Sequence, residues 1–400
     1  MPEKLRVGIA GVPRGVTFVP SFAAIAETEV VALCDLDREV LQRAGSEAGV
    51  SLLFTDYEQM LERARLDLVV VATPMPLHVP QSVAALERGL HVLCEVPAAT
   101  DLEQCWRLVQ AVRAGRGTYM MAENYCYTRE SVLVRAMARA GVFGEVYYGE
   151  GGYVHELKAL HEMTPWRRFW QVGLDGNTYP THSLGPLLQW TGSRVTTVSC
   201  MGSGHHYRDS RGRPYGGQDT TTTLCALASG GMLTLRLDLV SERPANGSHY
   251  ALQGTRGSYL SARRDEEEPL VWLLGRSPDA ETWEELWDYE QEFLPEPWRN
   301  PGEEARRAGH GGGDYYEVRE FVDALLRGAR PPIDVFDALD FTVPGLVSRE
   351  SLRRGGIPVP VPDWRGIERF PEDLPALLRD SAILRVSPPG PGRAGDSPPA

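Results

Sequence analysis

Apolar residues follow two different patterns in the two halves of the chain. From Leu5 to Tyr125, runs that are apolar almost throughout alternate with segments of helical periodicity. The runs are LRVGIAG, EVVALCD, LDLVVVAT, HVLCEVP and TYMMAENY; helices are expected at about Thr17 to Ala26, at Arg38 to Ala48, in HVPQSVAALERG and at Leu102 to Ala114. Strands that are buried on both faces are typical of parallel sheets covered by helices. This half is therefore predicted to be α/β, with a doubly wound parallel sheet.

From about Ser131 the pattern changes. One helical segment, RESVLVRAMARAG, precedes several strand-like runs with no helix between them: GEVYYGEGGYV, TTTTLCALASG, GMLTLRLDLVS, SHYALQG and SYLSAR. Such a succession predicts an α+β half with an open, mainly antiparallel sheet. Helices are expected in DYYEVREFVDALLRG and at about Phe336 to Arg353. The stretch Asp265 to Glu304 is rich in charge and tryptophan and is expected to form a surface flap.

This change of pattern predicts two domains, residues 1–124 and 125–365, in a chain of 400 residues. The division agrees with the usual domain size of about 100 to 200 residues. Residues 386–400 are rich in Pro, Gly and Ser and are expected to be a disordered tail.

Charge narrows the range of partners. With 41 basic and 54 acidic residues the net charge is −13, which argues against nucleic acid and against an anionic membrane surface. No apolar run reaches the ~20 residues of a membrane span and no signal peptide is evident, so a cytoplasmic protein with a small polar ligand is expected. The six cysteines include no C-x-x-C pair; neither a disulfide framework nor a metal site is predicted.

A glycine turn follows the first predicted strand. Gly8, Gly11 and Gly15 stand there, and Asp35 closes the second strand. This arrangement places a pyrophosphate on a helix N-terminus and a carboxylate on the adenosine ribose, as in a Rossmann dinucleotide site. Pro13 departs from G-x-G-x-x-G and removes one N–H, and such glycines can equally serve a tight turn alone. The surrounding β-α-β pattern favours the cofactor site, and Asp35 favours NAD over NADP.

Two further strand ends carry polar residues. DLVVVATPMPLH ends with Thr73, Pro74 and His78, and HVLCEVP ends with Glu95, Val96 and Pro97. In open α/β sheets the ligand binds at this edge.

The glycine turn, TP-x3-H and E-x-P, followed by a β-rich half, together resemble the Gfo/Idh/MocA family of NAD(P)-dependent sugar oxidoreductases over about residues 4 to 365. Most dehydrogenases of that family have a lysine between Glu95 and Pro97, near the site of hydride transfer. Here the residue is Val96, which argues against plain dehydrogenase chemistry.

A closer resemblance is to the NAD-dependent glycosidases of glycoside hydrolase family 109, which also lack that lysine. It rests on MMAENYCYTRE, GEGGYVHELK, PWRRFW, NTYPTHSLGP, SERP and GHGGGDYY. The resemblance implies that the sugar faces Tyr153, Arg167, Tyr179, Pro180, Thr181 and His182. It implies NAD contacts at Gly11, Arg14, Gly15, Asp35, Thr73, His78, Glu95, Val96, Asn124 and Tyr179.

The resemblance also implies a reaction that departs from the usual pair of carboxylates. The sugar is oxidised at C3, deprotonated at C2, loses the C1 oxygen by elimination, gains water and is reduced again, so that NAD is recycled. His182 is the candidate for the hydroxyl proton. Tyr153 is the candidate C2 base, and His155 lies two residues further along the same strand face.

Two departures from the family pattern bear on specificity. The R-P pair is usually followed by a tyrosine that reaches the substrate, whereas Ala245 stands here, and the segment between His155 and Trp166 is shorter than usual. An NAD-dependent glycosidase is the first hypothesis, a sugar or cyclitol dehydrogenase the second, and a weakly catalytic sugar-binding relative the third. Family likeness further implies a homo-oligomer built on the open sheet face.

Overall fold

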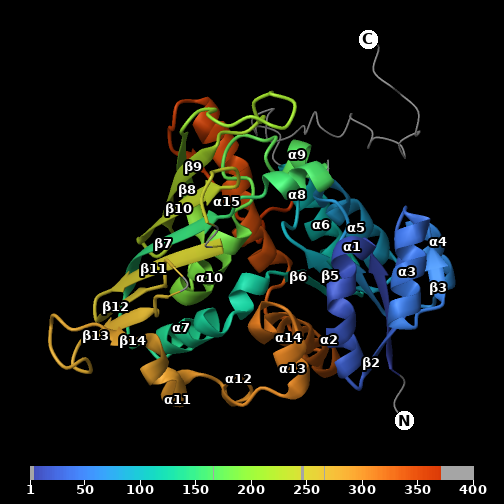
Figure 1. Ribbon diagram of the computed structural model, residues 1–400, viewed down its shortest axis with the longest axis horizontal. Coiled ribbons are helices and arrows are strands. Elements are labelled where there is room, and N and C mark those ends of the chain that lie inside the picture. Colours follow the sequence, from blue (N-terminus) through green and yellow to red (C-terminus); the bar gives the residue numbers. More distant parts are fainter. Residues whose placement is uncertain (1–3, 165, 245–246, 265, 371–400) are drawn as a thin grey trace.

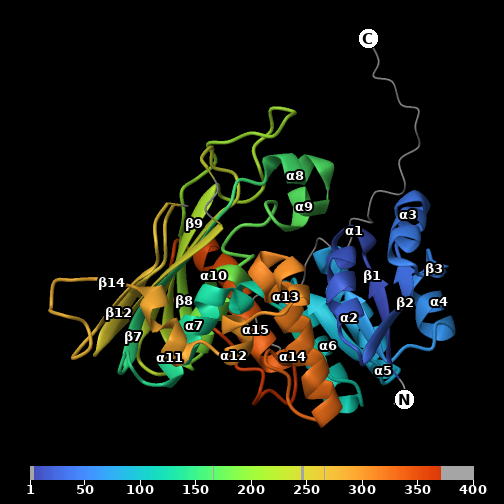
Figure 2. The ribbon, with the colours of Figure 1, turned by 60° about the horizontal axis from the view of Figure 1, so that its bottom comes forward.

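A computed structural model describes residues 4–164, 166–244, 247–264 and 266–370. Two sheets stand at opposite sides of the molecule, with helices α10 (Thr181–Thr191), α14 (Gly313–Arg327) and α15 (Val335–Arg353) between them (Figures 1 and 2). Ala245 and the predicted tail 386–400 lie outside the described residues.

The first sheet is parallel and has the order β3-β2-β1-β4-β5-β6. Its strands are β1 (Leu5–Ala10), β2 (Thr28–Cys34), β3 (Leu52–Phe54), β4 (Leu68–Val71), β5 (His91–Glu95) and β6 (Tyr119–Ala122). The strand order reverses between β1 and β4, and this switch point is where doubly wound sheets bind ligands. The predicted doubly wound sheet is confirmed.

The helices of this half are α1 (Val12–Gly15), η1 (Val16–Phe18), α2 (Val19–Ala24), α3 (Arg38–Ala48), α4 (Tyr57–Arg63), η2 (Met75–Leu77), α5 (His78–Glu87) and α6 (Leu102–Ala114). The expected start of the first helix at Thr17 was wrong, because helical backbone begins at Val12, directly after Gly11. Pro13 falls in the first turn of α1, where a missing N–H costs no intrahelical bond.

The second sheet has the order β14-β13-β12-β11-β7-β10-β9-β8-β15. Its strands are β7 (Val146–Val154), β8 (Val195–Gly202), β9 (Thr220–Leu227), β10 (Met232–Asp238), β11 (Gly247–Gly254), β12 (Gly257–Leu260), β13 (Leu270–Leu273), β14 (Glu284–Glu285) and β15 (Val359–Pro360). β10 pairs with β7 in parallel, and the other pairings are antiparallel. The predicted mainly antiparallel sheet is confirmed.

Helix α10 (Thr181–Thr191) lies directly on one face of β7. A Cβ atom on Gly151 would stand 2.1 Å from the carbonyl oxygen of Ser183, so the glycines of GEGGYV allow this close approach. The opposite face of the sheet carries no helix in either view (Figures 1 and 2). Other helices of this half are η3 (Asn124–Tyr127), α7 (Arg129–Arg139), α8 (Lys158–Met163), α9 (Trp166–Trp170), α14 (Gly313–Arg327) and α15 (Val335–Arg353).

The segment expected to be a surface flap contributes regular structure instead. β13 and β14 extend the edge of the sheet. After them come η4 (Leu286–Tyr289), α11 (Glu290–Phe293), α12 (Glu296–Arg299), α13 (Glu303–Arg307) and η5 (His310–Gly312). The tryptophan content has a packing reason: Trp298 is 5% exposed and stacks on Tyr316 at 4.1 Å between ring centroids.

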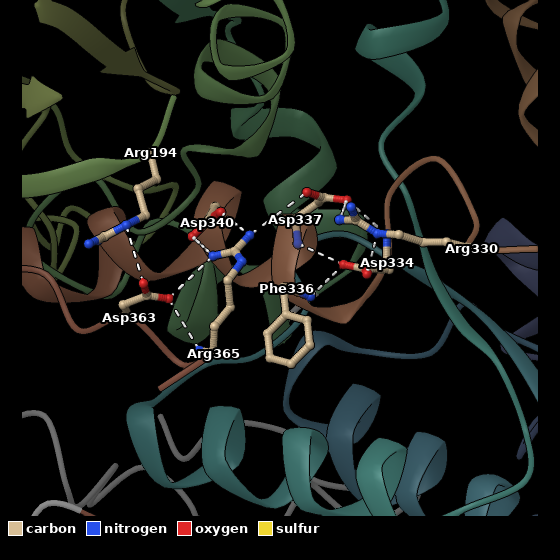
Figure 3. A network of polar contacts seen from close by, with 8 residues as sticks. All are labelled: Arg194, Arg330, Asp334, Phe336, Asp337, Asp340, Asp363 and Arg365. Atoms are coloured by element: carbon tan, nitrogen blue, oxygen red, sulfur yellow. Dashed lines mark hydrogen bonds and ion pairs between the residues drawn. The ribbon is translucent and has the colours of Figure 1, made fainter. Parts of the chain in front are cut away.

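After β15 the chain returns to the first half, and we call residues 361–370 the strap. Arg113 in α6 donates hydrogen bonds of 3.1, 3.0 and 2.8 Å to the carbonyl oxygens of Trp364, Arg365 and Ile367. Figure 3 shows the side chain of Arg365 between Asp363 and the carboxylates of α15, with Asp340 at 2.7 Å. The strap thus ties α15 to α6. The proposed domain boundary at 124/125 falls within η3.

Among residues 4–370, in the described ranges, no helix combines the length and the apolar character that crossing a bilayer requires.

Candidate active site

Five predicted cofactor residues meet at one edge of the first sheet. Gly11, Asp35, Thr73, Glu95 and Asn124 stand at or just beyond the carboxyl ends of β1, β2, β4, β5 and β6. These strands are parallel, and their order in the sheet is β2-β1-β4-β5-β6. Their carboxyl ends therefore form one continuous rim, which is the place for a dinucleotide in this topology.

The glycine turn is fixed by close backbone approach. Gly11 has φ 86°, and a Cβ there would lie 2.4 Å from the carbonyl carbon of Ala72. A Cβ on Gly15 would lie 2.4 Å from Cγ2 of Ile9. Both positions need glycine because a side chain there would collide with neighbouring protein atoms.

Asp35 has two tasks in this turn. Its Oδ2 accepts a 2.9 Å hydrogen bond from the N–H of Val12, and its Oδ1 accepts one of 3.0 Å from Asp37. A carboxylate oxygen has a second lone pair, so both oxygens still have capacity for ribose hydroxyls. The residues at this rim fit NAD.

Arg14 and Glu95 form an ion pair across the rim, with 2.5 Å between Nε and Oε1. The pair joins the glycine turn to the end of β5. Val96, which follows Glu95, is 5% exposed and places an uncharged, apolar side chain at this point of the rim.

His78 lies beneath the rim and is 1% exposed. Its Nδ1 is 2.9 Å from the carbonyl oxygen of Pro97, and its Nε2 is 2.8 Å from that of Thr73. Burial opposes a charge here, but Cys94 and the two carbonyl acceptors outweigh it and raise the pKa of His78 to about 9. His78 therefore holds the ends of β4 and β5 together, and its ring nitrogens face protein groups rather than a ligand.

A second histidine forms a dyad with a buried carboxylate. Nδ1 of His182 donates to Oε1 of Glu123 at 2.7 Å, and Glu123 is fully buried. Tyr125 N–H donates to the same oxygen at 3.2 Å. Because Nδ1 carries the hydrogen, the neutral ring presents Nε2 as an acceptor, and Nε2 has no hydrogen-bond partner among the described residues.

Three tyrosines surround the His182 ring. The ring centroids of Tyr125, Tyr153 and Tyr179 lie 4.4, 4.8 and 5.1 Å from it. Burial is the main cause that raises the pKa of each phenol. For Tyr153, the neighbouring Tyr179, Tyr125 and Glu123 add to this effect, whereas Arg167 opposes it. These phenols are hydrogen-bond donors at neutral pH.

Arg167 comes from α9, and its positive charge acts on Tyr153 and Tyr179 of this cluster. Its Nη1 donates to Oε1 of Gln171 at 3.1 Å, and its guanidinium lies 4.5 Å from the ring centroid of Trp166. The predicted neighbour His155 lies beside Tyr153, with 5.8 Å between ring centroids. The structure thus brings Tyr153, His155, Arg167, Tyr179 and His182 together.

Pro180 and Thr181 are buried and begin helix α10. The carbonyl oxygen of Pro180 accepts hydrogen bonds from the N–H groups of Ser183 and Leu184. These two residues set the direction of His182, and the buried hydroxyl of Thr181 has no hydrogen-bond partner among the described residues.

Glu123 was not among the residues expected to act. Its place at the end of β6 was the available signal, but its partner His182 is 59 positions away in sequence. His310 was not among the expected residues either. Its Nε2 lies 3.1 Å from Nδ2 of Asn124, which is 186 positions earlier in the sequence.

Comparisons with known proteins agree with this arrangement. Residues 127–367 match the family described as "Glycosyl hydrolase 109, C-terminal domain", and residues 5–123 match that described as "Oxidoreductase family, NAD-binding Rossmann fold". A glycosyl hydrolase family 109 protein of Saccharopolyspora erythraea is 32% identical over 90% of this chain and 83% of its own length. One of Solibacter usitatus is 31% identical over 90% and 88%.

Solved structures show the same fold. A levoglucosan dehydrogenase in complex with NADH and levoglucosan superposes with a TM-score of 0.77 at 21% identity, covering 90% of this chain and all of the other. Both resemblances drawn from the sequence are confirmed. Together with the rim and the His182 dyad, they make this chain a member of glycosyl hydrolase family 109, an NAD-dependent enzyme with a Gfo/Idh/MocA Rossmann half.

Proposed function

We propose that the enzyme hydrolyses a glycoside by transient oxidation of the sugar at C3, deprotonation at C2, elimination of the C1 oxygen and addition of water. The observation that carries this proposal is the buried Glu123–His182 dyad, whose free Nε2 faces the tyrosine cluster next to the cofactor rim. NAD, when held at the rim by residues such as Gly11, Asp35 and Asn124, would supply a hydride acceptor for C3 and, once reduced, a hydride donor.

His182 takes the C3 hydroxyl proton in this proposal. An imidazole whose Nδ1–H is held by a carboxylate is a stronger base at Nε2, and the ion pair formed on protonation stays inside a dry site. Glu123 acts through His182, so it is a positioning residue.

Tyr153 removes the C2 proton, and it must be ionised to do so. Burial disfavours the phenolate, and the positive charge of Arg167 favours it. Once C3 is a ketone, the C2 hydrogen is acidified, so a small ionised fraction of Tyr153 suffices. Arg167, Tyr179 and His155 are proposed to bind the sugar hydroxyls around it.

The uncovered face of the second sheet is proposed as the contact between copies of the chain. Leu224, Met232 and Leu260 lie on the same face in the strand register and are 46, 43 and 38% exposed. Sedimentation of the protein, compared with a Leu224→Glu variant, tests this association.

Hydrolysis in deuterated water tests the reaction. The proposed route removes and restores the C2 proton, so the released sugar carries deuterium at C2, and aglycone appears without net NADH. Direct displacement at C1 would leave protium at C2. Stoichiometric accumulation of NADH without aglycone release would instead identify a sugar dehydrogenase.

A further inference from the structure

A small polar pocket adjoins the tyrosine cluster. It lies between the chain that follows α9, the end of the loop 203–219 and the neighbouring ends of β9 and β10. Its lining includes Gln171, Gly217, Asp219, Thr221 and Leu237. Its interior volume is about 20 Å³, which holds one water molecule or one hydroxyl group. The roles proposed above use none of these five residues.

Two side chains of the lining carry polar atoms without partners. Oδ1 of Asp219 and Oγ1 of Thr221 are buried and have no hydrogen-bond partner among the described residues. The other oxygen of Asp219, Oδ2, accepts from the N–H of Tyr207 at 3.1 Å. Leaving a buried polar atom unpaired is costly. The pocket therefore suits a ligand group that donates to a carboxylate and accepts from a hydroxyl, and a hydroxyl group does both.

The strand register places the pocket beside the proposed C2 base. Leu237 pairs with Tyr153 on one side and with Thr221 on the other. Side chains paired in this way point to the same face of a sheet, and Thr221 and Tyr153 are both buried there. Because neighbouring strands are about 4.8 Å apart, the backbones of Thr221 and Tyr153 are about 10 Å apart. Gln171 joins the pocket to the sugar-binding residues, since its Oε1 accepts from Arg167.

The order of the strands gives the site a direction. His182 lies toward β11, because its carbonyl oxygen accepts from the hydroxyl of Tyr250 in that strand. Tyr153 belongs to β7 and Thr221 to β9, and the strand order is β11-β7-β10-β9. The groups proposed to act at C3 and C2 therefore come before the pocket in this order. Since C1 follows C2 in the ring, we expect the group bound through the C1 oxygen to reach the pocket.

Backbone contacts fix the wall of the pocket. The N–H of Gly217 donates to the carbonyl oxygen of Val172 at 2.8 Å, and a Cβ on Gly217 would lie 2.5 Å from the carbonyl oxygen of Leu174. Arg168 and Asp209 form an ion pair of 2.7 Å that ties the same loop to α9. The polar atoms of the pocket are thus held in place before a ligand binds, which lowers the cost of binding.

We propose that this pocket is the subsite for the leaving group and that it selects an alcohol with further hydroxyl groups, namely a second sugar or a polyol; this assignment rests on the proposed glycosidase function. One hydroxyl of the leaving group donates to Oδ1 of Asp219 and accepts from the hydroxyl of Thr221. A plain alkyl group leaves both atoms unpaired, so the site discriminates against it.

Three glycosides that differ in the leaving group test the subsite, each prepared from D-glucose and from D-galactose in both anomers. They are the propyl glycoside, the 2,3-dihydroxypropyl glycoside and the (1→4)-linked disaccharide with glucose as leaving group. In the parent, kcat/KM is expected to be about threefold or more higher for a hydroxylated leaving group than for propyl. The dihydroxypropyl glycoside and the disaccharide, compared with each other, show whether a polyol or a sugar fits better.

Thr221→Val removes the hydroxyl and keeps the shape of the side chain. It should lower kcat/KM for the hydroxylated leaving groups about three- to tenfold and leave the propyl glycoside within about twofold. Thr223→Val is the matched control and should behave as the parent, because Thr223 is equally buried on the same strand but is not among the residues that line the pocket.

Equal kcat/KM for all three glycosides in the parent, or an equal loss for all three in Thr221→Val, would overturn the subsite and leave the glycosidase function intact. If the parent oxidises the glycosides and accumulates NADH without cleaving them, the glycosidase function fails. The same comparison, made on the rates of NADH formation, then still decides whether the pocket binds the group at C1. A parent that neither cleaves nor oxidises any of them ends both proposals.

Discussion

Oε1 of Glu123 lies 2.7 Å from Nδ1 of His182, so a carboxylate at the end of a parallel strand fixes the tautomer of an imidazole in a helix of the other half. The surrounding structure fixes the orientation of both side chains, because Glu123 is fully buried and three tyrosines enclose His182. The base of the proposed reaction is thus assembled from residues of both halves of the chain.

Replacement of Glu123 by glutamine should remove the activity without removing the cofactor. The amide can donate to Nδ1, which would place the hydrogen on Nε2 and block proton acceptance. We expect kcat to fall about 10²- to 10⁴-fold, with an NADH dissociation constant near that of the parent by fluorescence titration. Glu350→Gln, a buried carboxylate paired with Arg353, is the control. Loss of NADH binding in Glu123→Gln would assign Glu123 to the cofactor instead.

Asp35 is expected to set the preference for NAD over NADP. Its charge repels a 2′-phosphate, whereas the N–H of Val12 needs only an acceptor. Asp35→Asn removes the charge and keeps the oxygen that accepts from Val12, but it loses the acceptor for the N–H of Asp37. It should narrow the ratio of NADPH to NADH dissociation constants about tenfold or more. Asp37→Asn, which caps α3, leaves the ratio unchanged. Equal affinity for both cofactors in the parent would contradict the assignment.

His78 should make stability depend on pH. Its pKa in the folded state, about 9, lies above the ordinary value of 6.5, so the folded chain binds the proton more tightly. The resulting stability is complete below pH 6.5 and is lost as pH rises through 9. By linkage it amounts to at most about 3 kcal/mol. Urea unfolding of the parent and of His78→Gln at pH 6 and pH 9.5 measures it; parallel behaviour of the two proteins would refute it.

Exchange at C2 should accelerate with pH. Because burial raises the pKa of Tyr153, only an ionised minority can act as base, and that minority grows about tenfold per pH unit. Deuterium uptake at C2, measured before aglycone release, is expected to follow this slope between pH 6 and pH 8. Tyr153→Phe should suppress the uptake more strongly than it suppresses the first formation of NADH. A pH-independent exchange rate would point to another base.

The sequence predicted those elements whose signal is local. The parallel strands, α6 and most strands of the second sheet follow from apolar runs and periodicity, and YPTH and GGY identified residues that do come together. β3 and α4 were missed, since β3 has three residues on an edge and none of them is buried. β14, the edge strand, was hidden in a charged segment because an edge strand needs few apolar positions. β13 has the apolar sequence LVWL and was overlooked within the same segment.

The parts of the site that could not be predicted are pairings between distant positions. His182 and Glu123, Arg14 and Glu95, and His310 and Asn124 are separated by 59, 81 and 186 residues. No periodicity encodes such a pair, because its members belong to different elements that only the folded sheet order brings together. The same is true of Asp35, whose bond to Val12 exists because β1 and β2 are paired in parallel and end side by side.

The strap bears on how the cofactor enters and leaves. Arg113 of α6 donates hydrogen bonds to three carbonyl oxygens of the strap. The two halves are therefore joined by the strap as well as by η3. We expect these two connections to resist a hinge motion that would separate the halves. A catalyst that regenerates its cofactor in place has no need to release it between turnovers. We therefore expect bound NAD to exchange with free nucleotide far more slowly than the sugar turns over, and Arg113→Ala to shorten that residence time.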